Sequence, residues 1–373
     1  MLQNKIYLNY LSEIFKTFIT ILLGLSLIAL TVRAVNFLDL IVESGYSVTT
    51  YFHYSLLNLF GITPKFIPFS FLLCLMIFII KHGQDSEFTI LWTSGVEKIQ
   101  LVNLFFLNGI IIMILYILLS GFISPFALNK SRQLLSEDQL NSFLPTIKTQ
   151  QFSDSFKGLT FIVDKKSGNE INNIFLHDKS NNLKNLSSNI SDTSSTTIIA
   201  RNGIVEKQNL FLMNGEIISS KKDNSKNEII KFDQLKIDLT NLTTTTIKKP
   251  KLQETSTLKL FSCFLKKEEI DSCEKNLKKE IITTLNRRLV LPLYIPVIAL
   301  ICSLLLIKNK KKYWNKISIF SICFILLLFT ELSVRYTGIN NYIKILFITL
   351  PGILIITFYL FLKLRFSNEL KKI

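Results

Sequence analysis

The run LVLPLYIPVIALICSLLLI, from Leu289 to Ile307, decides the fold class of this chain. Its 19 residues include no Asp, Glu, Lys or Arg. About 18 or more consecutive apolar residues are enough for a helix to cross the hydrocarbon core of a bilayer, because a helix satisfies its backbone hydrogen bonds internally. The run therefore predicts a transmembrane helix.

Five further runs of this kind form, together with the first, two groups of three. They extend over Phe15–Leu38, Tyr54–Ile80, Ile99–Ala127, Ile317–Val334 and Ile345–Leu362. The first is too long, and carries too many charges at Lys5, Glu13 and Lys16, for a cleaved signal peptide. We predict six transmembrane helices, three in residues 1–127 and three in residues 289–373, with a polar insert between the groups.

The distribution of basic residues predicts the orientation, because Lys and Arg near helix ends resist translocation. Six spans place three basic segments on one side of the membrane: Lys5 and Lys16; Lys308, Lys310, Lys311, Lys312 and Lys316; and Lys363, Arg365, Lys371 and Lys372. The loop 39–53 on the opposite side has no Lys or Arg. We expect the basic side to be cytoplasmic, which puts the insert outside the cytoplasm.

The first part of the insert alternates short apolar segments with turn formers, as β-strands do. The apolar segments are Leu159–Val163, Ile174–Leu176, Thr197–Ala200, Asn209–Met213 and Ile229–Phe232. The predicted turns and loops are Ser167–Asn169, Ser180–Ser195, Arg201–Gly203 and Asn214–Gly215, with Thr240–Thr246 and Lys248–Pro250 at the exit. We predict an all-β sandwich, jelly roll or open barrel over residues 128–256.

Helical spacing of apolar residues returns from Thr257 to Leu285 and predicts a helical connector over residues 257–288. Cys263 and Cys273 lie there, on the predicted oxidising side. A disulfide between them is one alternative, although two cysteines ten residues apart on one continuous helix could not meet. The other cysteines, Cys74, Cys302 and Cys323, are expected to pack as small hydrophobes within the spans.

Motifs of self-contained enzymes are absent from the sequence, which has no phosphate-binding P-loop, no H-E-x-x-H and no G-x-S-x-G. We expect no catalytic site, no metal and no cofactor of its own. The net charge of +16 does not indicate nucleic-acid binding, because residues 126–286 carry 24 basic against 19 acidic residues without an aromatic-basic stripe.

The most specific local signal is KHGQDSEFTILWTSGV, from Lys81 to Val96. Asp85 or Ser86 can cap a short helix at about 85–96, which Gly95 would end. Its expected apolar face consists of Phe88, Ile90, Leu91 and Trp92. Two interpretations stay open at this point: a contact for a cytoplasmic ATPase, or an ordinary interfacial helix with its Trp at the headgroup level.

The chain resembles the LptF/LptG (YjgP/YjgQ) permeases of lipopolysaccharide export over essentially its whole length. The resemblance is carried by the Asp85–Val96 run, the Ile67-Pro68-Phe69 step, the Arg287–Leu293 run RRLVLPL and the three-plus-three layout. Three insert segments look closer to the F-type subunit than to the G-type: residues 158–163, 174–178 and 197–203. A departure is Thr284-Leu285-Asn286, where the family commonly has an acidic residue and a His.

This resemblance implies a permease subunit in the bacterial inner membrane whose insert is a periplasmic β-jellyroll. The implied partners are a G-type homologous permease, a dimeric cytoplasmic ATPase that binds the ATP, and a single-span partner with a similar jellyroll. The implied substrate is lipopolysaccharide, which the complex extracts from the membrane and passes to a periplasmic bridge.

In that family the loop after the second span is the coupling helix, and its acidic residue engages a basic residue of the ATPase. Glu87 matches this acidic residue. The coupling residues that the resemblance implies here are Asp85, Glu87, Phe88, Leu91 and Trp92.

Because the implied substrate is an anionic glycolipid, basic residues in the outer halves of the spans are its expected contacts. Arg33 matches a family position that lines the lipid cavity, and its guanidinium suits bidentate phosphate contact, with snorkelling to the headgroups as the alternative. Lys65, flanked by two prolines on a helix expected to kink, either lines the cavity or snorkels. Glu331 and Arg335, spaced i to i+4, are expected to pair with each other.

A competing class is a membrane scaffold or sensor that transports nothing and binds a ligand through its β domain. Exporters of the lipoprotein-releasing or macrolide type normally place their large outer domain after the first span. The position of the insert after the third span weighs against them.

Overall fold

The computed structural model describes residues 2–38, 41, 47–141, 149–156, 158–179, 193–206, 209–221, 227–238, 251–264, 278–307 and 312–370. Several sequence features lie outside these residues: 180–192, Thr240–Thr246, Lys248–Pro250, Cys273, Lys308–Lys311, and Lys371 and Lys372. The chain divides into two compact units. One comprises Met1–Thr31, Asn58–Asn129 and Lys251–Ile373, and the other comprises Val32–Leu57 and Lys130–Pro250.

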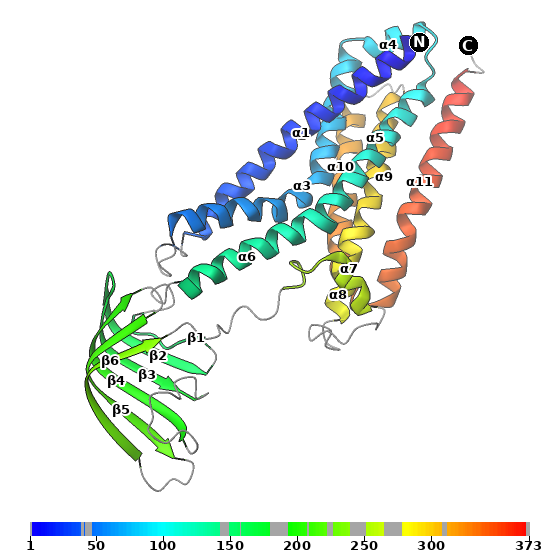
Figure 1. The fold of residues 1–373 in the computed structure, drawn as a ribbon. Helices are drawn as coiled ribbons and strands as arrows, with labels where there is room; N and C mark the ends of the chain where they lie inside the picture. The colour runs from blue at the N-terminus through cyan, green and yellow to red at the C-terminus, as the bar shows by residue number, and fades with distance from the viewer. Residues whose placement is uncertain are drawn as a thin grey trace. The chain divides into compact units, whose positions relative to one another are not determined.

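Helices make up the first unit and the parts of the second that adjoin it in sequence (Figure 1). They are α1 (Leu2–Asn36), α3 (Val48–Gln84), α4 (Glu87–Thr93), α5 (Lys98–Leu118), α6 (Ser124–Asn141), α7 (Thr257–Phe264), α8 (Lys278–Leu289), α9 (Tyr294–Ser303), α10 (Lys312–Tyr336) and α11 (Asn341–Leu370). A π-helical turn, η1 (Leu119–Ile123), joins α5 to α6, and 3-10 turns η5 (Leu291–Leu293) and η6 (Leu304–Leu306) flank α9.

Six helical segments among the described residues are long and apolar enough to cross a membrane, which confirms the predicted spans. They are Lys5–Asn36, Val48–Gln84, Lys98–Leu135, Lys278–Leu306, Trp314–Tyr336 and Asn341–Asn368. The helix α8, assigned to the connector from the sequence, continues through η5 into α9, so the fourth helical segment runs from Lys278 to Leu306. The second span runs through both of its prolines as one 37-residue helix.

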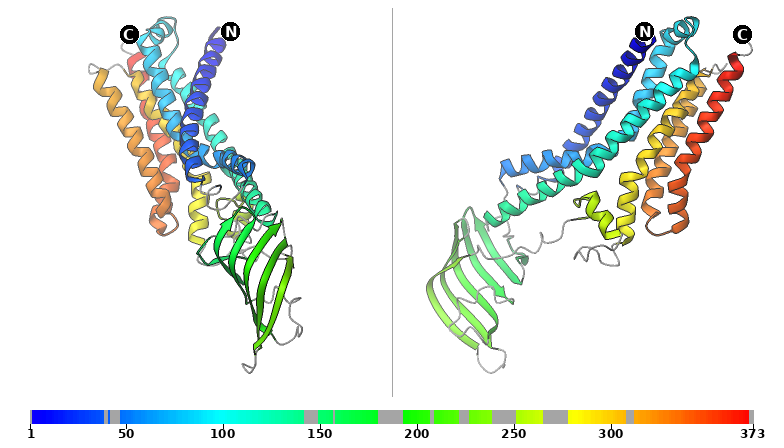
Figure 2. Two further views of the ribbon diagram at one scale, coloured as in Figure 1. Left: turned by 90° about the vertical axis from the view of Figure 1, so that its left-hand side faces the viewer. Right: turned by 45° about the vertical axis from the view of Figure 1, so that its right-hand side comes forward.

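The helical core is centred on α9, all ten residues of which are buried. In Figure 2 (right), α9 runs between α5 and α11. A Cβ atom on Gly109 of α5 would lie 3.1 Å from the Cα atom of Pro296 and 3.3 Å from the Cβ atom of Ala299. Small residues allow this close approach of two helices, and close packing is what holds helices together where lipid offers no hydrophobic gain.

Arg288 of α8 fastens the segment that returns from the insert to the fourth span. The Arg288 side chain is buried and donates hydrogen bonds to the carbonyl oxygens of Thr255 (2.9 Å) and Gln253 (3.1 Å), and to Oγ1 of Thr257 (3.0 Å). The Thr257 hydroxyl in turn donates to the carbonyl oxygen of Gly121 in η1 (2.6 Å). A buried guanidinium is tolerated because these acceptors replace water.

Glu331 pairs with Arg335, as expected, and makes a shorter contact with Arg287 of α8. Its Oε1 atom lies 2.6 Å from Nη2 of Arg287 and 3.9 Å from Nη2 of Arg335. The helical neighbour at i+4 was visible in the sequence, whereas the contact between α8 and α10 depends on tertiary packing. Cys263 of α7 is disulfide-bonded. Cys74, Cys302 and Cys323 are free and buried, as expected.

The β domain is one six-stranded antiparallel sheet in the order β1-β2-β3-β4-β5-β6. The strands are β1 (Ser153–Phe156), β2 (Leu159–Ser167), β3 (Glu170–Asp178), β4 (Thr193–Glu206), β5 (Asn209–Lys221) and β6 (Asn227–Asp238). The all-β insert is confirmed. Its described strands form a curved meander in chain order (Figure 1), whereas a jelly roll has two sheets linked by Greek-key crossings.

A crease crosses five strands of this sheet at Asp164, Asn173, Arg201, Asn214 and Asp233. At each of these positions the residue pairing skips one residue, as between Val163–Ile174 and Lys165–Asn172. The inward face therefore changes parity along each strand; β4, for example, buries Ile198 and Ala200 before the crease and Val205 after it. Because all five strands change together, one apolar face continues across the sheet.

The crease explains why two predicted turns lie inside strands. Arg201–Gly203 belongs to β4 and Asn214–Gly215 to β5, both in the middle of long strands. Asn173 and Asn214 have φ angles of +52° and +53°, a region that Asn tolerates better than most residues. At Asn214 the sequence signal was therefore right about conformation and wrong about topology, whereas no residue of Arg201–Gly203 has a positive φ. The tight turn at Ser167–Asn169 is confirmed, with Gly168 at φ +59° between β2 and β3.

Gly215→Ala should destabilise the β domain by about 2 kcal/mol, because overpacking without room to relax costs that much. A Cβ atom there would clash with the carbonyl oxygen of Ile199 and lie 2.5 Å from Cζ of Phe232. Hydrogen exchange of β4 and β5 amides in the full chain measures the loss. Asn214→Gly, which suits the positive φ, is the matched control; equal protection in both variants would contradict the packing argument.

Candidate functional site

The candidate site is built around α4, which is shorter than the sequence suggested. Ser86 precedes it with φ +59° and makes no side-chain capping bond, so the expected cap by Asp85 or Ser86 is not formed. The C-terminal end of the helix is formed as predicted. Gly95 has φ +91°, and the N–H of Val96 donates to the carbonyl oxygen of Leu91 (3.0 Å). A left-handed glycine after the last turn satisfies carbonyls that the helix leaves open.

Burial separates the residues that were expected to form one apolar face. Phe88 and Leu91 are 3% and 7% exposed and belong to the helical core. Trp92 is half-buried and stacks on Phe88, with ring centroids 6.3 Å apart. Ile90 is 64% exposed and lies off that face. Therefore α4 is anchored by Phe88 and Leu91, and it presents Ile90 outward together with the exposed Asp85.

A buried histidine joins α4 to α1 and α3. His82, 2% exposed, has its Nδ1 atom 3.0 Å from the carbonyl oxygen of Phe78. Its Nε2 atom lies 3.2 Å from Oε2 of Glu13 on α1 and 3.4 Å from Oε2 of Glu87 on α4. The two ring nitrogens of His82 therefore face acceptor groups only: one carbonyl and two carboxylates.

Further contacts complete this cluster, which we call the carboxylate cluster (Tyr10, Glu13, Lys81, His82 and Glu87). The Lys81 ammonium donates to Oε1 of Glu13 (3.0 Å), and the Tyr10 hydroxyl donates to Oε2 of Glu87 (3.3 Å). The Tyr10 ring also meets His82 edge to face, with centroids 5.2 Å apart. As a result, Glu87 is held from both α1 and α3 while 44% of its side chain stays exposed.

A groove of about 400 Å³ opens beside this cluster, between α1 and α4. It is lined by Lys5, Ile6, Asn9, Tyr10, Glu87, Ile90 and Leu91. Its walls combine the exposed Ile90, the basic Lys5 and the Glu87 carboxylate, which Tyr10 and His82 already hold in place.

Sequence reasoning missed four members of the cluster: Tyr10, Glu13, Lys81 and His82. Glu13 had a usable signal, because an acid beside an apolar run, within a segment that continues into a membrane span, needs a partner. The identity of that partner was not readable, since His82 lies on a different helix 69 positions away. Proximity of this kind comes from the packing of α1 on α3.

The two candidate substrate residues belong to different units. Arg33 lies in the last turn of α1 and is exposed, in the unit that contains the β domain. Lys65 is exposed on α3, between the buried Pro64 and Pro68, in the helical unit. Each side chain is accessible on its own element, as lipid contact requires. Among the described residues no group of His, Cys, Asp and Glu is arranged to hold a metal ion.

Residues 9–365 match the family model of the lipopolysaccharide export system permease LptF/LptG. The chain belongs to the LptF/LptG family. It is therefore a multi-pass membrane protein and a permease component of lipopolysaccharide export. No curated protein matches the chain in a sequence comparison. The match spans both groups of helices, the β domain and α4, so the resemblance drawn from the sequence is confirmed at the level of the family.

His82→Leu should destabilise this LptF/LptG-family chain by about 2 kcal/mol, because hydrogen bonds to charged groups contribute on that scale and two carboxylates would be left facing each other. Thermal unfolding in detergent measures the effect. His53→Leu is the matched control, since His53 makes the same Nδ1 contact to a carbonyl four residues back, Thr49 (2.9 Å), but is exposed. Adding Glu87→Gln to His82→Leu should recover part of the loss; no recovery would speak against charge repulsion.

Proposed function

We propose that this permease is an F-type subunit that couples ATP hydrolysis by a dimeric cytoplasmic ATPase to extraction of lipopolysaccharide from the inner membrane. It works with a G-type homologue and a single-span jellyroll partner, and it passes the glycolipid to a periplasmic bridge. The chain itself hydrolyses nothing; the partner binds the ATP. The F-type assignment rests on the resemblance of residues 158–163, 174–178 and 197–203.

The observation that supports the coupling role is the attachment of α4 to the helical core and to α1 and α3. An ordinary interfacial helix needs no more than an apolar face, whereas α4 buries Phe88 and Leu91 in the helical core and holds Glu87 through Tyr10 and His82. Through these contacts a displacement of α4 acts directly on α1 and α3. The exposed Ile90 and the groove beside it supply the surface on which the ATPase docks.

The energetic problem is to lift a lipid with several acyl chains out of its leaflet, at about 0.8 kcal/mol per CH₂ moved toward water. In the proposed cycle, a cavity between this subunit and its G-type homologue shelters the chains. Movement of α4 and α1 on nucleotide binding then closes the cavity and sends the lipid toward the apolar face of the β domain. That face is continuous across the crease and includes Phe161, Ile198 and Leu212.

Glu87→Arg should abolish co-purification of the ATPase and delivery of lipopolysaccharide, because it reverses the charge offered to a basic residue of the partner. Glu97→Arg is the matched control: Glu97 is an exposed acid ten residues along the chain, at the start of α5. Pull-down of the ATPase from membranes and lipopolysaccharide release from proteoliposomes are the measurements.

Glu87→Gln separates misfolding from lost coupling, because it keeps the shape of the side chain and its contact with Tyr10. We expect this variant to be as abundant as the parent chain and to bind the ATPase at least about tenfold more weakly, as for loss of one charged partner. If Glu87→Arg leaves both ATPase association and lipopolysaccharide delivery intact, the coupling assignment is wrong.

A photocrosslinking amino acid at position 33 or 65 should label lipopolysaccharide in membranes, because both side chains are exposed on membrane helices and are basic in the parent chain. Position 23 is the control, since Leu23 is 51% exposed and lies ten residues before Arg33 on α1. Labelling is detected by an anti-lipopolysaccharide blot. The absence of labelled glycolipid at both positions, with ATP present, would remove the substrate-contact assignment.

A further inference from the structure

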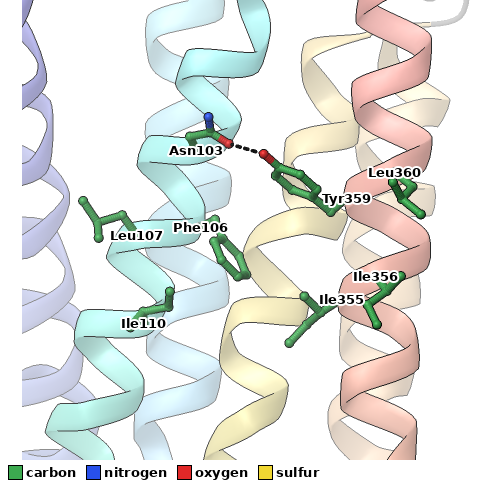
Figure 3. A pocket seen from close by; sticks show the side chains of 8 residues that line it. All are labelled: Asn103, Phe106, Leu107, Ile110, Ile355, Ile356, Tyr359 and Leu360. Atoms are coloured by element: carbon green, nitrogen blue, oxygen red, sulfur yellow. Dashed lines mark hydrogen bonds between the residues drawn. The ribbon is translucent and has the colours of Figure 1, made fainter.

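An apolar groove of about 590 Å³ lies between α5 and α11 (Figure 3), away from the carboxylate cluster. It is lined by Asn103, Phe106, Leu107, Ile110, Ile355, Ile356, Tyr359 and Leu360. The size falls in the range of small-molecule sites, about 300–1,000 Å³. Both walls belong to membrane-spanning segments, so the groove opens at the depth of the lipid.

Polar groups stand at one end of the groove. The Tyr359 hydroxyl donates to Oδ1 of Asn103 (3.2 Å) across the gap between α5 and α11. In Figure 3 the amide nitrogen of Asn103 points away from Tyr359. This nitrogen offers a donor at the mouth of an otherwise apolar groove, and a polar side chain on the lipid-facing surface of a span calls for a polar ligand.

Basic residues follow one turn farther toward the same end. Lys98 begins α5, about 7 Å from Asn103 along the axis at 1.5 Å per residue. Its Nζ atom lies 4.8 Å from the ring centroid of Trp92 and 5.6 Å from that of Phe366 on α11, so it bridges the two walls. Lys363 is exposed and lies four residues after Tyr359, on the same face of α11.

Along the helix axes the order is therefore basic, hydrogen-bonding and apolar. A glycerophospholipid has the same order: an anionic headgroup, ester carbonyls and acyl chains. Basic clusters beside the ends of transmembrane helices favour anionic lipids. One lipid molecule, with an acyl chain in the groove and its headgroup beside the lysines, matches this order.

We propose that the groove between α5 and α11 binds one acyl chain of an anionic glycerophospholipid from the leaflet on the side of Lys98 and Lys363. The Asn103 amide donates to an ester carbonyl, and Lys363 contacts the headgroup phosphate. The site is separate from Glu87, Arg33 and Lys65, so it stands whether or not the proposed coupling holds. The bound acyl chain fills the gap between α11 and α5.

Photolabelling of the full chain in nanodiscs tests this site. The probe is phosphatidylglycerol with a diazirine on one chain, compared with phosphatidylcholine that carries the same chain, and labelled peptides are mapped by mass spectrometry. Ile356→Trp fills the groove, and Ile353→Trp is the matched control; the two isoleucines are 61% and 59% exposed on the same helix. Lys363→Ala tests the headgroup contact.

We expect phosphatidylglycerol to label peptides of α5 and α11. Ile356→Trp should lower this labelling at least about fivefold, as for loss of a few buried methylenes, while Ile353→Trp leaves it unchanged. Lys363→Ala should reduce the preference for phosphatidylglycerol over phosphatidylcholine. Equal labelling of the two Trp variants, or of the two lipids in the parent chain, would overturn the proposal. So would loss of labelling in the assembled complex with crosslinking to another chain in its place.

Discussion

The enclosure of α9 is the constraint on which the helical unit depends. All ten of its residues are buried, and the span that contains it has 72% of its most apolar window inside the protein. Lipid tails are as apolar as leucine, so burial there comes from packing and not from exclusion of water. Gly109 and Ala299 permit that packing, and α5, α10 and α11 take their positions from it.

Two buried polar side chains, Arg288 and His82, then fix the ends of the helical bundle, which apolar packing alone does not orient. At one end of the bundle, Arg288 holds the backbone of residues 252–255 and the hydroxyl of Thr257, where the chain returns from the β domain. At the other end, His82 holds Glu13 and Glu87. Each is a buried polar side chain whose removal leaves several acceptors without their contact, so each specifies one arrangement of its neighbours.

The sequence predicted what depends on composition along the chain, and it failed where the outcome depends on packing between segments. Length and apolarity predicted six spans, and Gly95 predicted the end of α4. Asn214 was interpreted as a turn because its tolerance of positive φ is a local property, whereas the continuation of β5 through it depends on β4 and β6. Arg288 was not recognised as central because its partners lie more than 30 positions away, and His82 because its partner Glu13 lies on another helix. The roles of Glu87, Arg33 and Lys65 came from family resemblance.

The spans differ in how much of each is buried, and this difference bears on how the carboxylate cluster transmits a displacement of α4. The most apolar window of the second span is 67% buried, while that of the first is 17% buried. Within this chain α1 therefore packs against less protein than α3 does. Glu13 and Tyr10 tie α1 to His82 and Glu87, so a displacement of α4 in the proposed cycle is taken up mainly by α1. Because α1 also carries Arg33 in its last turn, the proposed cycle links a push at Glu87 to the candidate lipid contact through this helix.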